Sequence, residues 1–189
     1  MAKLYFNYGT VSSAKTANLI MMAHSYRTKN KKVLIIKPSI DNRYGDNYIG
    51  SRTGLKIEAD IILTPQTNLI RNEKIVFDKF DIILVDEVQF LTIKQIEQLK
   101  KLSIIFPVYC FGLKTNYKIQ LFEASKRLIE IADYLNEIES ICNYCSSKAI
   151  INAKHLNNKI IINDITDDID IGGDEKYLGL CWNCFETLQ

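Results

Sequence analysis

The sequence contains no apolar run long enough to cross a bilayer, and its longest apolar runs have the length of β-strands. Its first residues, Met1 to Phe6, lack the long apolar stretch of a secretory signal. The excess of one sign of charge is also small, because the 189 residues carry a formal net charge of only +2. That excess is too small by itself to indicate nucleic-acid binding. These absences predict a cytoplasmic protein that binds neither a membrane nor nucleic acid.

Histidines, repeats and low-complexity segments are scarce as well. The two histidines are isolated, which is typical of surface or packing residues rather than of metal ligands. No internal repeat occurs beyond two Cys-x-x-Cys pairs, and no low-complexity linker is present. The hydrophobic fraction of 47% and the charged fraction of 24% are ordinary for a globular chain. This length predicts one moderate domain with a small appended lobe.

Strand-like and helical patterns alternate along residues 1–139. The strand–loop–helix–strand order predicts a parallel α/β sheet with helices on both faces. After Glu139 the composition changes, and residues 140–189 hold the four paired cysteines and short β-prone runs. We therefore predict an α/β domain at 1–139 and a zinc-binding lobe at 140–189. The expected strands are 4–8, 33–36, 61–63, 81–86 and 108–113, and the expected helices follow Thr16 and span 92–102 and 121–134.

One N-terminal segment matches most of the phosphate-loop pattern G-x-x-x-x-G-K-[ST]. It lies between a predicted strand and a helical pattern, which is the context that the motif requires. In such a loop, backbone N–H groups surround phosphates at a helix N-terminus. The lysine contacts the β- and γ-phosphates, and the hydroxyl of the last residue binds Mg²⁺. The candidate ATP-binding residues are Gly9, Thr10, Val11, Ser12, Ser13, Ala14, Lys15 and Thr16.

Ala14 replaces the second glycine of this pattern. A Cβ at that position resists the backbone angles and the close phosphate approach that glycine allows, at a cost of about 1 kcal/mol or more. For the segment taken alone, an ordinary turn before an amphipathic helix is the alternative interpretation.

Asp86 and Glu87 follow four apolar residues, so they are expected at the carboxyl end of a central strand. Ligands bind at that edge of open α/β sheets. Asp86 is a candidate for holding Mg²⁺ through water, and Glu87 for taking a proton from a hydroxyl that attacks the γ-phosphate. Alternatively, both carboxylates only end a strand and face solvent. The phosphate loop one strand away favours the functional interpretation.

Four of the five cysteines form the pairs Cys142/Cys145 and Cys181/Cys184, separated by 35 residues. Four thiolates complete a tetrahedral zinc site with no open position, which predicts a structural zinc. The alternatives are two unrelated pairs or a redox dithiol. A redox dithiol requires a helix N-terminus beside a thioredoxin-like βαβ pattern, and we expect neither pair to have that setting. The intervening segment would form a loop anchored at both ends, suited to closing over a ligand.

Together these residues resemble the cellular-type, zinc-containing thymidine kinases, a family that also occurs in bacteria. The resemblance covers nearly the whole chain, and its specific elements are the Asp-Glu-x-Gln-Phe segment and the paired cysteines. It implies a P-loop (RecA-like) fold and transfer of the ATP γ-phosphate to the 5′-hydroxyl of thymidine in nucleotide salvage for DNA synthesis. It also implies Mg²⁺, structural Zn²⁺ and a homotetramer. The matching segments are 9–16, 40–43, 51–54, 85–90, 112–117, 121–122 and 171–181.

The resemblance also assigns roles to residues. Glu87 matches the catalytic base, and residues 151–177 resemble the lasso, a loop that covers the nucleoside and binds thymine largely through backbone groups. The residues that match ATP- and Mg²⁺-binding positions outside the loop are Asp41, Arg43, Asp86 and Gln89. The residues that match substrate-binding positions are Phe90, Leu113, Tyr117, Phe122, Ile171, Gly172, Gly173 and Tyr177.

The chain departs from the family pattern at several of these places. Val11 stands where a methionine is common, and Asn152 where many members have a small or hydroxyl-bearing lasso residue. Tyr117 replaces a phenylalanine and adds a hydroxyl that needs a partner. These differences, with Ala14, bear on affinity and nucleoside selectivity more than on the type of reaction.

Two other functions stay open on the sequence. One is a different P-loop enzyme, such as another nucleoside kinase or an ATPase. The other is a zinc-ribbon binding module, or a degenerate kinase that binds nucleotide without chemistry, which only Ala14 favours. The retained Lys15, Thr16, Asp86 and Glu87 argue against a protein without chemistry.

Overall fold

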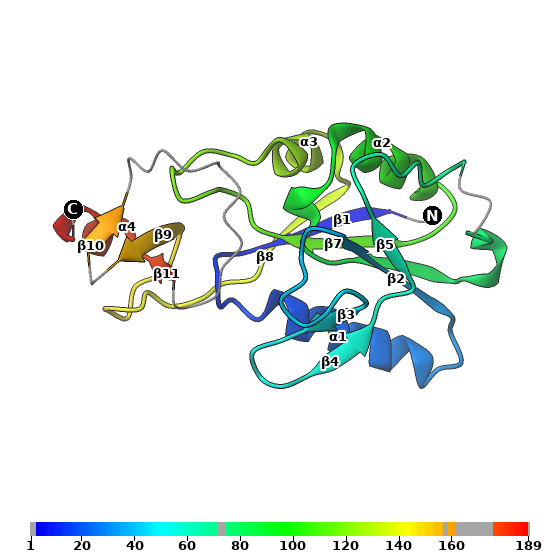
Figure 1. The fold of residues 1–189 in the computed structure, drawn as a ribbon, viewed down its shortest axis with the longest axis horizontal. Helices are drawn as coiled ribbons and strands as arrows, with labels where there is room; N and C mark the ends of the chain where they lie inside the picture. The colour runs from blue at the N-terminus through cyan, green and yellow to red at the C-terminus, as the bar shows by residue number, and fades with distance from the viewer. Residues whose placement is uncertain (1–2, 72–74, 157–158, 162–175, 189) are drawn as a thin grey trace.

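A six-stranded parallel sheet forms the centre of the computed structural model, which describes residues 3–71, 75–156, 159–161 and 176–188 (Figure 1). Every neighbouring pair in this sheet is parallel. The α/β class predicted from the sequence is therefore confirmed. Across the sheet the strands are β5 (Ile61–Leu63), β2 (Val33–Pro38), β6 (Ile82–Val85), β7 (Val108–Gly112), β1 (Leu4–Tyr8) and β8 (Tyr134–Glu137).

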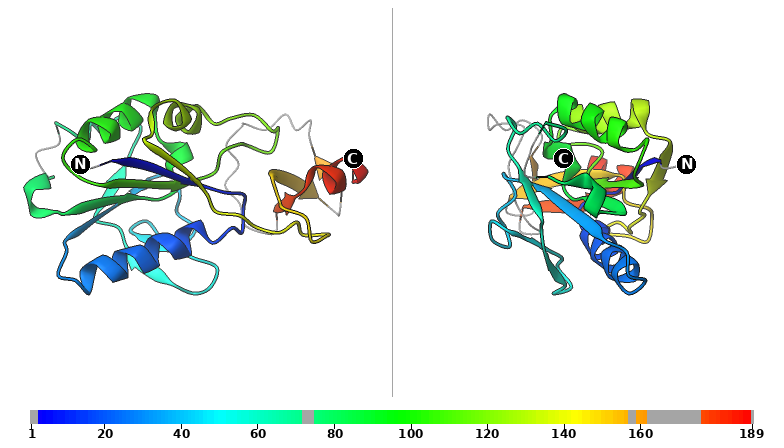
Figure 2. Two further views of the ribbon diagram at one scale, coloured as in Figure 1. Left: turned by 180° about the vertical axis from the view of Figure 1, so that it is seen from behind. Right: turned by 90° about the vertical axis from the view of Figure 1, so that its right-hand side faces the viewer.

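Helices cover both faces of this sheet (Figures 1 and 2). Helices α2 (Ile93–Leu102) and α3 (Glu123–Ile131) lie on one face. Helix α1 (Lys15–Arg27) lies on the other face with a hairpin of β3 (Tyr48–Gly50) and β4 (Lys56–Glu58), which the sequence did not predict. Short 3₁₀ turns η1 (Phe77–Lys79) and η2 (Val88–Phe90) complete this part of the chain.

The central strands are apolar on both sides because both faces are covered. In β2, Leu34 and Ile36 join the core beneath α2 and α3, whereas Val33 and Ile35 join the core beneath α1. Helix α2 begins at a capping box in which Thr92 and Gln95 satisfy each other's backbone N–H groups. The predicted helix 92–102 is thus confirmed, and Thr92 is its N-cap.

A smaller antiparallel sheet lies at the end of the molecule opposite the N-terminal end of β1 (Figures 1 and 2). Its order is β10 (Lys159–Ile161), β9 (Ile151–Leu156), β11 (Tyr177–Leu180), and α4 (Trp182–Thr187) follows it. We call residues 140–189 the cysteine lobe; the division of the chain at 139/140 stays a prediction. Among the described residues, no helix is long and apolar enough to cross a membrane.

The predicted helix 121–134 is wrong at its end. Helix α3 stops at Ile131, Ala132 is extended, and Tyr134 starts strand β8, which pairs with β1. The side chain of Asp133 accepts a hydrogen bond from the Leu4 backbone N–H, so a partner 129 residues away fixes this boundary. Helical periodicity carries no information about such a partner.

Candidate active site

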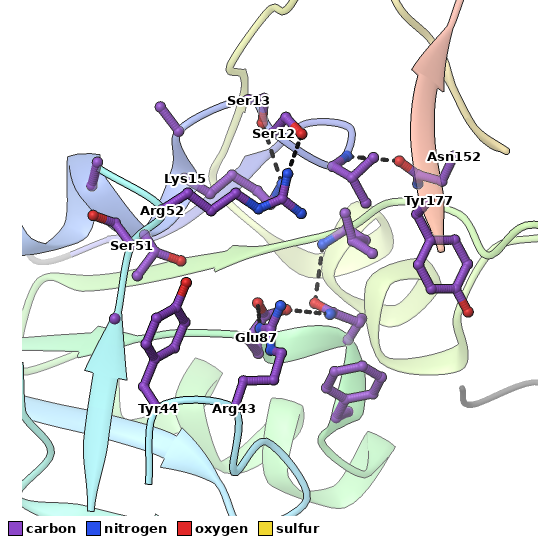
Figure 3. A pocket seen from close by; sticks show the side chains of 18 of the residues that line it. Ser12, Ser13, Lys15, Arg43, Tyr44, Ser51, Arg52, Glu87, Asn152 and Tyr177 are labelled. Atoms are coloured by element: carbon purple, nitrogen blue, oxygen red, sulfur yellow. Dashed lines mark hydrogen bonds and ion pairs between the residues drawn. The ribbon is translucent and has the colours of Figure 1, made fainter. Parts of the chain in front are cut away.

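A cavity of about 320 Å³ opens at the carboxyl ends of β1, β2, β6 and β7 (Figure 3). It is bounded by the phosphate loop, the loops after these strands, the β3–β4 hairpin, and strands β9 and β11. This is the edge at which ligands bind in open α/β sheets. The residues predicted from the sequence that line it are Val11, Ser12, Ser13, Ala14, Lys15, Thr16, Arg43, Glu87, Gln89, Phe90, Leu113, Tyr117, Phe122 and Tyr177.

Four other predicted residues, all within the described part of the chain, do not line this cavity. Gly9, Thr10, Asp41 and Asp86 are positioned one layer behind the cavity wall, where they contact residues that do. The predicted lasso residues Ile171, Gly172 and Gly173 fall outside the described residues.

The phosphate loop curls around the ammonium group of Lys15. This side chain is buried, and its Nζ donates hydrogen bonds to the Thr10 carbonyl at 2.5 Å and to the Ser13 hydroxyl at 3.2 Å. Burial lowers the pKa of Lys15 to about 8, although the carboxylates of Glu87 and Asp86 oppose the shift. An anion in the cavity would offset that desolvation, so the site favours phosphate groups.

Two residues of the loop have left-handed backbone angles without being glycine. Ser12 has φ of 63° and Ala14 has φ of 61°. The sequence-based expectation of strain at Ala14 is therefore supported by its geometry, yet the loop still forms. Glycine at position 9 is explained by space and not by backbone angles, because a Cβ there would lie 2.4 Å from the Ile138 carbonyl oxygen and from Ser13 Oγ.

Asp86 and Thr16 meet at the start of α1. The Thr16 hydroxyl donates to Asp86 Oδ2 at 3.1 Å, and Asp86 is only 3% exposed. Burial raises the pKa of Asp86 to about 7, and the nearby carboxylates of Glu87 and Asp41 add to the shift. A divalent cation would favour the ionised form of this carboxylate. A buried carboxylate beside a hydroxyl therefore fits a Mg²⁺ site of the P-loop kind.

Glu87 lies across the cavity from the loop and is held at both carboxylate oxygens (Figure 3). Arg43 donates to Oε1, and the Gln89 amide donates to Oε2 at 2.6 Å. Arg43 is itself oriented by Asp41, whose Oδ1 lies 2.7 Å from Nε. Ionic partners on both sides keep the pKa of Arg43 above its usual range even though burial opposes this. The arrangement fixes a carboxylate in the cavity wall.

Gly112 is a site residue that sequence reasoning missed. The Gln89 amide oxygen accepts from the Leu113 backbone N–H at 3.0 Å, so Gln89 ties Glu87 to the end of β7. A Cβ on Gly112 would lie 2.5 Å from that same amide oxygen. Only glycine leaves room for Gln89 here.

Apolar side chains form the part of the cavity farther from the loop. The rings of Phe90 and Phe122 meet edge to face with centroids 6.1 Å apart, and Leu113 lines the wall beside them. Tyr117 is 2% exposed, and its hydroxyl is buried with no hydrogen-bond partner among the described residues. A flat apolar wall with one unsatisfied hydroxyl suits a planar base.

Asn152 joins the cysteine lobe to this site. Its Oδ1 accepts from the Val11 backbone N–H at 2.8 Å, and its Nδ2 donates to the Thr115 carbonyl at 2.8 Å. One amide therefore connects β9, the phosphate loop and the loop after β7. The sequence identified Asn152 as a departure from the family pattern but did not predict this bridging role.

Several further wall residues were not predicted as site residues. Tyr44, Ser51, Arg52 and Thr53 come from the loop after β2 and from the β3–β4 turn. The segment 51–54 resembles the family, which was the available signal, but its place in space depends on an unpredicted hairpin. The remaining unpredicted wall residues are Ala17, Gly50, Thr115 and Asn116.

The four paired cysteines converge in the cysteine lobe, and their sulfur atoms all lie within 4.8 Å of one another. The Cys145 and Cys181 sulfurs are 3.6 Å apart, close to the edge of about 3.8 Å in a tetrahedron with Zn–S bonds of about 2.3 Å. Hydrogen bonds from Ser147 lower the pKa of Cys145 to about 6, which favours a thiolate ligand. The donor set fits zinc.

One cysteine pair has part of the setting that a redox dithiol requires. Cys181 is the N-cap of α4 and accepts from the Cys184 N–H, so one pair does lie at a helix N-terminus. The local strands are antiparallel, however, so the thioredoxin-like βαβ setting is absent from the described part of the lobe. Convergence of all four sulfurs supports metal binding over dithiol chemistry.

Comparison with known proteins places this geometry in a family. A family model described as thymidine kinase matches residues 2–185. A thymidine kinase of Streptococcus gordonii is 37% identical over 183 residues, which is 96% of this chain and 94% of the relative. Thymidine kinases of Encephalitozoon cuniculi and Lactiplantibacillus plantarum are 34% and 36% identical, each over 96% of this chain and over 86% and 94% of their own lengths.

These matches extend across both residues 1–139, which we call the phosphate-loop body, and the cysteine lobe, so they include every part of the cavity wall. The chain belongs to the thymidine kinase family and is a phosphotransferase of that family.

Proposed function

We propose that the protein transfers the γ-phosphate of ATP to the 5′-hydroxyl of thymidine, giving dTMP and ADP, with Glu87 as the general base. The observation that carries this proposal is the position of Glu87, which lines the same cavity as Lys15 and the phosphate loop. Arg43 and Gln89 hold its two oxygens, so its orientation is fixed before substrate arrives.

The proposed reaction uses the cavity in two parts. The triphosphate binds against the loop from Gly9 to Thr16, where Lys15 neutralises charge. The nucleoside base packs between Phe90, Leu113 and Phe122. Glu87 accepts the 5′-hydroxyl proton while the 5′-oxygen forms a bond to the γ-phosphorus, and the bond to the bridging oxygen of ADP breaks.

Two metals accompany this assignment. Thr16 and Asp86 would hold Mg²⁺, which neutralises phosphate charge when bound. Cys142, Cys145, Cys181 and Cys184 would hold a structural Zn²⁺. A homotetramer and a cytoplasmic location, expected from the resemblance and from composition, stay predictions.

Steady-state kinetics of Glu87→Gln test the role of the base. The purified full chain is assayed with ATP, Mg²⁺ and thymidine. Removing the base lowers kcat by about 10²- to 10⁴-fold, with little effect on the KM for thymidine because Gln retains the shape. Glu97→Gln is the matched control, since Glu97 of α2 pairs with Arg127 of α3, away from the cavity. A Glu87→Gln enzyme as fast as the control would exclude Glu87 as the base.

One observation favours a second candidate, a nucleoside kinase with altered selectivity. The buried Tyr117 hydroxyl has no partner among the described residues, and a buried unsatisfied hydroxyl is costly. A nucleoside that offers it a hydrogen bond would be preferred. A panel of thymidine, deoxyuridine, deoxycytidine and deoxyguanosine decides between the two by kcat/KM; a base other than thymine in first place would establish the second candidate.

A further inference from the structure

Three cationic side chains face the cavity from different elements. Lys15 belongs to the phosphate loop and Arg43 to the loop after β2, while Arg52 belongs to the β3–β4 turn. In Figure 3, Arg52 extends alongside Lys15 toward Ser12 and Ser13, and Arg43 lies with Glu87 on the opposite side of the opening. Grouped cations repel one another, so this arrangement favours a polyanion between them.

Both arginines have partners among the described residues. Arg43 forms ion pairs with Asp41 and Glu87, so carboxylates of the protein already balance its charge. Arg52 donates from Nη1 to the neutral hydroxyl of Ser12, inside the phosphate loop. Its guanidinium therefore lies at the loop itself, where phosphate oxygens would be the stronger acceptors.

The backbone that carries Arg52 is firmly supported. Ser51 N donates to the Leu55 carbonyl at 2.8 Å, and Gly54 N donates to the Ser51 carbonyl at 3.1 Å, which closes the turn. Ile49 in β3 is 1% exposed and packs in the core beneath α1, the helix that begins at Lys15. Arg52 is thus attached to the same rigid unit as the phosphate loop.

Tyr44 connects this turn to the loop that carries Arg43. Its ring lies directly over Gly50, where a Cβ would come within 2.4 Å of the ring atoms. The loop that carries Arg43 therefore packs against the hairpin that carries Arg52. Planar guanidinium groups on two sides suit a phosphoryl group whose charge is spread over three equatorial oxygens.

We propose that Arg52 is a further catalytic residue that contacts the phosphoryl group during its transfer, replacing its hydrogen bond to Ser12 with bonds to phosphate oxygens. The inference rests on the proposed function, because it assigns Arg52 a place in that reaction. The hairpin would then act as an arginine donor within the same chain, on the opposite side of the phosphate from Arg43.

Steady-state kinetics of Arg52→Gln and Arg52→Lys test the proposal, with Arg27→Gln as the control because Arg27 is an exposed arginine in the last turn of α1. We expect kcat to fall about 10²- to 10³-fold in Arg52→Gln, because the variant lacks a hydrogen-bond donor to the charge that develops in the transition state. The KM for thymidine should change less than about threefold. Arg52→Lys recovers part of kcat, because it retains the charge but not the planar fork. Thermal unfolding checks that each variant is folded.

A second experiment adds guanidinium at millimolar concentration to Arg52→Ala. We expect the added guanidinium to restore activity without changing stability, which would not occur if Arg52 had only a structural role. A kcat of Arg52→Gln within about threefold of the control, or a loss that follows only the fraction of folded protein, overturns the proposal. The wild type and Arg27→Gln are assayed in parallel. If they phosphorylate thymidine normally and Arg52→Gln does too, only this inference fails; if the wild type does not, both proposals fail.

Discussion

At the scale of single residues, Ala14 shows how the chain tolerates a departure from its motif. The glycine position of the phosphate loop has φ of 61°, in the left-handed region that alanine enters at a cost of about 1–2 kcal/mol. The loop nevertheless closes around Lys15 and starts α1 directly afterward. The cost therefore falls on stability rather than on the geometry of the site.

Ala14→Gly is expected to stabilise the protein by at most about 1 kcal/mol, because relief of the left-handed strain exceeds the extra unfolded-state entropy of glycine. Its kcat should stay within about threefold of wild type, since the loop is already formed. Denaturant unfolding and steady-state kinetics measure the two effects. Ala23→Gly, in the interior of α1 and away from the cavity, is the control and should destabilise by about 1 kcal/mol or more. A large gain in kcat for Ala14→Gly would contradict this view.

Residues whose chemistry follows from a local sequence motif could be predicted from the sequence. Lys15, Thr16, Asp86 and Glu87 all lie at or beside the cavity. Sequence reasoning missed the role of Asn152, whose amide has partners in two distant loops. Such a residue has no local signature, because its function arises only when the chain folds.

At the scale of elements, the connection between α3 and β8 shows where periodicity stops being informative. Residues 132–134 follow an amphipathic helix, and continuing that helix was the simplest prediction. Instead Asp133 accepts from the Leu4 N–H at 2.8 Å and from Lys100 Nζ at 2.9 Å, which draws β8 alongside β1. Strand β8 depends on a partner distant in sequence, so it was not predicted. The hairpin of β3 and β4 is local, but each of its strands has only three residues, too few for an alternating pattern to indicate them.

The Asp133 contacts predict a stability that depends on pH. Hydrogen bonds from Leu4 and Lys100 lower the pKa of Asp133 in the folded protein. A carboxylate with a lowered folded pKa stabilises above its unfolded pKa, near 3.8, and loses that contribution as pH falls through the folded value. Asp133→Asn should therefore destabilise the protein by about 1 kcal/mol at pH 7.

Urea unfolding at pH 7 and at pH 3 measures this difference, which should shrink at the lower pH. Asp78→Asn, at an exposed position in η1, is the control and should change little at either pH. A destabilisation of Asp133→Asn that is equal at both pH values would show that the charge of Asp133 is not involved.

At the scale of the whole molecule, the cysteine lobe closes one side of the active cavity. Tyr177 in β11 and Asn152 in β9 both line it, and both strands lead to the cysteine cluster. The sequence predicted the four ligands from their spacing alone. It could not predict their consequence for the site, because that depends on how the lobe packs against the sheet.

Metal removal tests this coupling. Stripping zinc with a chelator should unfold the lobe, because structural zinc contributes about 10–16 kcal/mol of binding free energy in small zinc domains. We expect elemental analysis to find one zinc per chain. After the zinc is removed, hydrogen exchange at the Val11 amide should be faster and the KM for thymidine should be higher. Cys145→Ser should reproduce these changes. Cys110→Ala is the control, since Cys110 is buried in β7 away from the cluster. Unchanged exchange at Val11 in zinc-free protein would contradict the coupling.

The hydrogen bonds of Asn152 have a consequence for how such chains can diverge or be recombined. The Val11 amide and the Thr115 carbonyl receive their partner from β9. A chimera that keeps this phosphate-loop body and takes its C-terminal part from a relative with a smaller residue at this place would leave both groups unpaired. The two parts of the chain must therefore change together, and the lobe cannot be exchanged as an independent module.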